Sequence, residues 1–216
     1  MNNMEKLKPL IEQIKSQFAE QKVIIALIND VEKHHNLDDP VTVRSINYLS
    51  YWLYITGQED SALYIAQTIN QITNSEDTVI KGCKHNCLVL CSYISAKMNN
   101  DQQSNDFWNK LLDMHFGYNV KEERKRINRK KWNRNITTGD NFESFEQQRQ
   151  NAENNNHIRG VVYYAFRSLE PLFWMSKMGG SEKYPLEKID KLIDERISFL
   201  NDNTDNADVR DFVGDV

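Results

Sequence analysis

Apolar residues recur every three or four positions along most of the chain, which is the spacing of one face of an α-helix. The first stripe, from Leu7 to Phe18, is continued by a second to about residue 35. Further helices are predicted over about 42–73 (two of them), 76–98, 103–115, 158–178 and from Pro185 onward. No segment alternates apolar and polar residues as a strand does, and no Asn-Gly or Asp-Gly hairpin turn occurs. The pattern predicts an all-α fold.

Residues 42–73 are predicted to form two antiparallel helices joined by a tight turn. The first helix ends at Gly57, and Ala62 and Ala66 lie one turn apart on the second, so that the two helices can pack closely. This segment resembles the tetratricopeptide repeat, on the positions Leu49-Ser50, Leu53, Gly57, Ala62, Ala66 and Ile69. The resemblance implies a surface that holds other proteins.

The rest of the chain follows the repeat pattern less closely. The next hairpin, at about 76–115, lacks a turn glycine, and Ser50 stands where the family usually has glycine. Because solenoids generally need three repeats for stability, two all-α architectures stay open. One is a superhelix of antiparallel helical hairpins, and the other is a compact bundle of eight or nine helices.

The length of 216 residues suffices for one large domain or two small ones. We expect a single all-α domain over 1–200, with a subdivision into 1–116 and 142–200 as the alternative. A basic segment at 117–141 would connect these parts. Residues 201–216 are mostly polar and acidic, which predicts a flexible tail.

Composition and charge indicate the cellular compartment in which the chain works. The net charge of −4 predicts no overall attraction to nucleic acid. The N-terminus carries charges every few residues, so it lacks the apolar core of a signal peptide, and no stretch approaches the length of a membrane span. The three cysteines are an odd number and form no disulfide framework. We therefore expect a cytoplasmic protein without membrane contact.

The cysteines could be read as part of a zinc site, because Cys83, His85, Cys87 and Cys91 lie within one short stretch. On a helix, however, His85 would point about 200° away from Cys83, and the three thiols would spread along ~12 Å of the axis. They cannot converge on one ion unless the helix unwinds. We interpret them as small buried apolar residues, and predict neither a metal nor a cofactor.

The segment 121–134 holds the strongest local charge, with eight basic and two acidic residues and hence +6. Three interpretations stay open: a contact with RNA or DNA, in which Trp132 would stack on a base, an acidic protein partner, or a solvated face. The candidate residues for the first two are Arg124, Lys125, Arg126, Arg129, Lys130, Lys131, Trp132 and Arg134.

Aromatic residues surround the predicted helix 42–56 on more sides than one buried face requires. Tyrosine, tryptophan and arginine concentrate in protein interfaces. The candidate protein-binding residues are therefore Arg44, Tyr48, Tyr51, Trp52 and Tyr64.

No nucleophile-elbow, phosphate-loop, zinc-protease or dinucleotide motif occurs, so no catalytic residue is predicted. The leading hypothesis is a non-catalytic protein–protein interaction module of a bacterial-type cytoplasmic protein, with an immunity or antitoxin-like role as one concrete version. The alternative is an RNA- or DNA-binding protein that uses residues 121–134. An enzyme with an unrecognised site in a helical bundle is the third hypothesis. The oligomeric state and the identity of the partner stay open.

Overall fold

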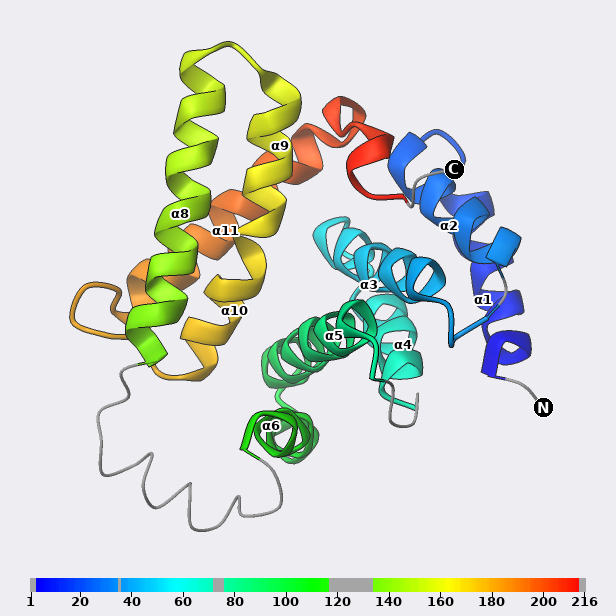
Figure 1. Cartoon of the computed structure of the whole chain (residues 1–216), viewed down its shortest axis with the longest axis horizontal. Coiled ribbons are helices and arrows are strands. Elements are labelled where there is room, and N and C mark those ends of the chain that lie inside the picture. Colours follow the sequence, from blue (N-terminus) through cyan, green and yellow to red (C-terminus); the bar gives the residue numbers. More distant parts are fainter. Residues whose placement is uncertain (1–2, 35, 72–75, 117–133, 214–216) are drawn as a thin grey trace. The chain divides into compact units, whose positions relative to one another are not determined.

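The computed structural model describes residues 3–34, 36–71, 76–116 and 134–213 (Figure 1). These residues are folded into helices joined by turns, and no strand occurs among them, so the predicted all-α fold is confirmed. The chain divides into two compact units. The first unit comprises residues 1–91 and 203–216, and the second comprises residues 92–202. The division falls within a helix rather than in the predicted connecting segment at 117–141.

The first unit is a set of helices that pack on their neighbours in sequence. Its elements are α1 (Asn3–Gln17), α2 (Lys22–His34), α3 (Pro40–Ile55), α4 (Glu59–Asn70), the part of α5 (Thr78–Lys97) up to Cys91, and the short 3-10 helices η1 (Thr204–Asn206) and η2 (Val209–Asp211). Helix α3 packs against both α2 and α4, and α1 packs against α2 and α4.

Local chemistry explains where α3 and α4 begin and end. The Asp39 carboxylate accepts hydrogen bonds from the backbone N–H groups of Val41 and Thr42, at 3.2 and 3.3 Å, and caps α3. Pro40 occupies the first turn, where its missing N–H costs nothing. Beyond α3, Gly57 has a φ of +79°, a left-handed conformation that glycine adopts without strain. The predicted helix–turn–helix is therefore present at Pro40–Asn70.

Helix α3 lies at the centre of the first unit, which explains its many aromatic residues. The Trp52 ring meets the Phe212 ring edge to face at 5.5 Å between centroids, and Tyr48 meets the same ring at 5.7 Å. Phe212 is buried. Residues 203–213 therefore pack on the unit, where the sequence led us to expect a flexible tail. Phe212 and Thr204 are buried in this polar segment, and both short helices pack on α2, which the composition of the segment does not reveal.

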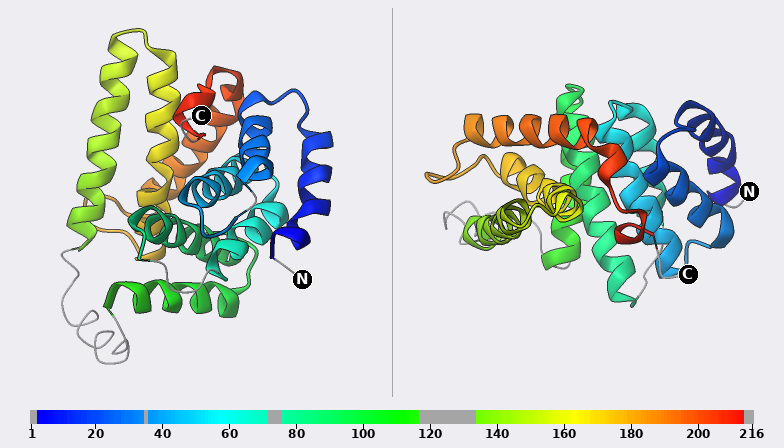
Figure 2. Two further views of the ribbon diagram at one scale, coloured as in Figure 1. Left: turned by 45° about the vertical axis from the view of Figure 1, so that its right-hand side comes forward. Right: turned by 90° about the horizontal axis from the view of Figure 1, so that it is seen from above.

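The second unit contains the end of α5 together with α6 (Asp101–Phe116), α8 (Arg134–Asn154), α9 (Ile158–Arg167), α10 (Leu169–Lys177) and α11 (Leu186–Asp202). Helices α8 and α9 lie side by side as a long hairpin (Figure 2). Helix α10 packs on α8 and on α11. The core holds the apolar side chains of these faces, including Phe166, Leu172, Phe173, Ile189 and Ile193.

The predicted helix over 158–178 is interrupted at Ser168, between α9 and α10. Pro171 causes this break by its position, since it has no backbone N–H to donate to the preceding turn. It sits in the first turn of α10, where a helix needs no such donor. The structure therefore has two helices where the sequence predicted one.

Candidate functional site

Two of the five predicted protein-binding residues belong to the core. Trp52 is 0% exposed and Tyr51 is 3% exposed. The Tyr51 hydroxyl donates a hydrogen bond to the backbone carbonyl of Asn86, at 3.1 Å, which joins α3 to α5. The prediction that these two side chains lie on a surface is wrong. Helix α3 is enclosed by several elements, so more than one of its faces is buried.

The other three residues lie on two different helices. Arg44 and Tyr48 are one turn apart on α3 and are half-buried. Tyr64 lies on α4 and is 47% exposed, as a large aromatic side chain on a surface. The face of α4 opposite Tyr64 is buried, through Ala62, Ile65, Ala66 and Ile69. The structure therefore keeps Tyr64 as a surface candidate and does not gather the five residues into one site.

The predicted basic site lies almost entirely outside the described residues. Arg124, Lys125, Arg126, Arg129, Lys130, Lys131 and Trp132 belong to that part of the chain, and Arg134 is the first residue of α8. The nucleic-acid and acidic-partner hypotheses for this segment stay predictions.

The three cysteines are buried along α5, as the sequence predicts. The Cys87 thiol lies 3.3 Å from the side-chain oxygen of Asn47 on α3. Burial raises the pKa of the Cys83 thiol to about 11 and that of Cys87 well above its usual range. These two thiols thus stay protonated near neutral pH, and the three buried cysteines act as small packing groups. In the described part of the chain, no three metal-ligating side chains come together as a metal site would require.

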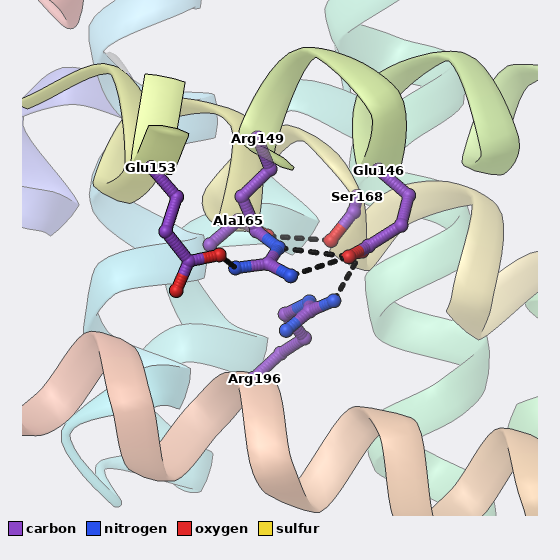
Figure 3. Close-up of polar contacts among 6 residues, drawn as sticks. All are labelled: Glu146, Arg149, Glu153, Ala165, Ser168 and Arg196. Atoms are coloured by element: carbon purple, nitrogen blue, oxygen red, sulfur yellow. Dashed lines mark hydrogen bonds and ion pairs between the residues drawn. The ribbon is translucent and has the colours of Figure 1, made fainter. Parts of the chain in front are cut away.

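A charged cluster that the sequence did not predict joins α8 to α11 in the second unit (Figure 3). Arg149 donates from Nε to the Glu146 carboxylate at 2.9 Å and from Nη1 to Glu153 at 3.2 Å. Arg196, on α11, donates from Nη2 to the second oxygen of the Glu146 carboxylate. One carboxylate is therefore held by two guanidinium groups, and the four charges sum to zero.

The electrostatics of this cluster follow from its burial. The Glu146 side chain is 20% exposed and that of Arg196 is 11% exposed. Burial opposes ionisation of Glu146, but the hydrogen bond from Arg149 and the charge of Arg196 outweigh it, so that the pKa of Glu146 is lowered. The three residues on α8 are spaced by three and four positions, a signal that the sequence carries. Arg196 lies 50 positions away from Glu146, and no local pattern pairs the two. The four charges of the cluster cancel, and the contact between Arg196 and Glu146 links α11 to α8.

A second polar cluster joins α6 to α10 and has the atoms of a serine–lysine pair. Lys177 Nζ lies 2.6 Å from Ser104 Oγ, and that hydroxyl donates to the Ser92 carbonyl at 2.7 Å. A neighbouring base that accepts the hydroxyl proton activates nucleophilic serines. Here Lys177 donates to Ser104 Oγ, and the Ser104 hydroxyl, which is completely buried, donates to a backbone carbonyl. The hydrogen bonds of this cluster link α10 to α6 and α5.

Together the described residues define an all-helical protein that comprises two compact units. The chain matches the family of unknown function DUF6707 over residues 2–202, and it belongs to that family. No curated protein and no solved structure matches the chain. Within the described ranges, none of the helices has the length and apolar character needed to cross a membrane.

Proposed function

We propose that this chain is a non-catalytic protein-binding protein of the cytoplasm, and that α4 of the first unit carries the binding surface. The observation that carries the proposal is the exposure of Tyr64. A tyrosine ring contributes a large contact area with little conformational entropy to lose, which is why tyrosines are frequent hot spots of interfaces. Nearly half of this side chain is open to solvent, while the aromatic residues of α3 are buried or half-buried.

The charge of the first unit supports a concrete version of this proposal. Its sequence holds 15 acidic and 9 basic residues, a net charge of −6, which leaves +2 for the second unit. An acidic surface attracts basic proteins and accelerates their association. An immunity or antitoxin-like protein, which neutralises a basic toxin by covering it, would use such a surface. This version rests on the negative charge of the first unit and on an analogy with small acidic proteins that neutralise basic toxins.

The proposal is tested by affinity capture from cells of the source organism, with the tagged full-length chain as bait and the captured proteins quantified by mass spectrometry. The variant Tyr64→Ala is compared with Ile158→Ala, which truncates a similarly exposed side chain on α9. Loss of a hot-spot side chain costs about 1–2 kcal/mol or more of binding free energy. We therefore expect Tyr64→Ala to reduce recovery of a specific partner by roughly five- to thirtyfold, and Ile158→Ala to leave it unchanged. Equal recovery with both variants would contradict the proposal.

A further inference from the structure

The outward face of α4 and its C-terminal cap form a stripe of four side chains, which we call the α4 stripe: Asp60, Tyr64, Gln67 and the capping residue Gln71. They are spaced by four, three and four positions, so they share one face of the helix. Asp60, Tyr64 and Gln71 are exposed and Gln67 is half-buried. The stripe therefore offers an aromatic ring, a carboxylate and two amides on a rigid helix rather than on a loop.

The charged side chains of α4 are all acidic. Helix α4 contains Glu59 and Asp60 and no lysine, arginine or histidine. Within the ranges that the structure describes, neither carboxylate forms an ion pair. Other acidic residues do so, as Glu32 pairs with Lys15 and Glu146 pairs with two arginines.

The positive end of the helix dipole accounts for carboxylates in the first turn of α4. It does not account for Tyr64, which lies one turn further along and leaves nearly half of its side chain in solvent. An exposed aromatic ring one turn from an unpaired carboxylate is the combination that receives a lysine or arginine side chain. The cation stacks on the ring face, and its N–H groups reach the carboxylate as charge-assisted hydrogen bonds.

We propose that the α4 stripe binds a lysine- or arginine-rich polypeptide segment of a partner protein. This inference rests on the proposed function and adds the chemistry of the partner. A cationic side chain of the partner lies on the Tyr64 ring and pairs with Asp60, and the Gln67 and Gln71 amides receive polar groups of the same segment. A second copy of the chain would bring like charges together on this face, and an anionic membrane surface would be repelled by it.

The test uses a displayed library of short random peptides, selected on the immobilised full-length protein, with affinities of the selected peptides measured by fluorescence anisotropy. We expect the selected peptides to be enriched in lysine and arginine and to bind more weakly as salt is raised. Asp60→Lys should weaken their binding by about tenfold or more, because it brings like charges together at the contact. Tyr64→Ala should weaken it similarly, whereas Tyr64→Phe should preserve it because the ring remains.

The matched control is Asp205→Lys, which makes the same change in charge on η1 of the same unit, at another exposed aspartate. It should alter affinity by less than about twofold, because Asp205 is not part of the α4 stripe and salt weakens the attraction of charges that do not contact the peptide. An equal loss with Asp205→Lys would show a diffuse attraction and overturn the inference. Selected peptides without an excess of basic residues would overturn it as well.

The outcomes separate this inference from the proposed function. If Tyr64→Ala abolishes binding of peptides that are neutral or acidic, α4 binds a partner of other chemistry, and only the basic-segment inference fails. If sedimentation shows self-association that requires Tyr64, the occupant is a second copy and the inference is overturned. If Tyr64→Ala changes neither peptide binding nor partner capture, the proposed function fails too.

Discussion

Replacing Glu146 by glutamine is expected to destabilise the second unit, because it removes the one carboxylate shared by Arg149 and Arg196. Glutamine keeps the shape of the side chain and can still accept a hydrogen bond. The substitution leaves Arg149, Arg196 and Glu153 with a net charge of +1. It also turns one of the two acceptor oxygens into an NH2 donor that faces a guanidinium group, so one accepted hydrogen bond is lost together with the charge while the packing is kept.

The magnitude follows from the burial of the three side chains. Removing one partner of a fully buried ion pair costs about 3–5 kcal/mol, and an exposed pair contributes about 0.2–1 kcal/mol. The Glu146, Arg149 and Arg196 side chains are 20%, 17% and 11% exposed, which is close to the buried limit. We expect Glu146→Gln to lower the free energy of unfolding by about 2–3 kcal/mol. That corresponds to a fall in Tm of roughly 5–10 °C.

The assay is urea unfolding of the full-length chain, followed by far-ultraviolet circular dichroism, for Glu146→Gln, Arg196→Met and the double variant. Because the two side chains are in contact, the double-mutant cycle should give a coupling of about 1–3 kcal/mol. Arg196→Met leaves Glu146 paired with Arg149, so it should cost less than Glu146→Gln.

The pH dependence of the stability difference provides a result that can refute this prediction. The pKa of Glu146 is lower in the folded state than its ordinary value of 4.5. Its stabilising contribution is therefore fully present above the pKa of the unfolded chain and is lost as the pH falls through the folded-state pKa. The stability difference between wild type and Glu146→Gln should be constant from about pH 7 to pH 5.5 and should shrink below about pH 4.5. A difference under about 0.5 kcal/mol at neutral pH, or one that persists unchanged in acid, would refute the argument.

Other predictions follow from single residues. Phe212→Ala should lower the free energy of unfolding by about 3–5 kcal/mol, because the Phe212 ring is buried against α3. Thermal melts measure this change, and a loss under about 1 kcal/mol would mean that the Phe212 ring is not packed on α3 as described. Gly160→Ala should destabilise the α8–α9 hairpin by about 1–3 kcal/mol, since a Cβ there would lie 2.7 Å from the ring Nδ1 of His157. Thermal melts measure this loss, and an unchanged Tm would show that the His157 imidazole moves aside. Changing Lys130 and Lys131 to glutamate tests the nucleic-acid alternative. If RNA or DNA binds there, the dependence of affinity on salt concentration should become less steep by about one unit for each phosphate that is no longer neutralised. If a steep dependence is unaffected, the basic segment is not the site.

Much of the helical architecture could be predicted locally. The spacing of Leu7, Ile11, Ile14 and Phe18 predicts α1, and the Asp39-Pro40 pair predicts the start of α3. The turn at Gly57 needed no tertiary information, because a left-handed residue between two apolar stripes is most often glycine. The buried cysteines were likewise predictable from their place in the stripe of α5.

The candidate site was harder to predict, because exposure belongs to the fold. The sequence placed Tyr51, Trp52 and Tyr64 in one group by residue type alone. Only the packing of α3 against several elements shows that the first two are core and the third is on the surface. The same holds for Phe212, whose burial depends on helices more than 150 positions earlier.

The sequence by itself determined the helical class, the ends of α3 and the turn to α4, and the burial of the cysteines, because each depends on periodicity and on backbone chemistry within a few residues. The tertiary structure decided which aromatic ring of the α3–α4 hairpin remains exposed to solvent. It also decided that Glu146 meets Arg196, which lies 50 positions away. The physical reason is that solvent exposure and long-range ion pairs are set by which faces pack together, and many arrangements of the same helices are compatible with one hydrophobic pattern.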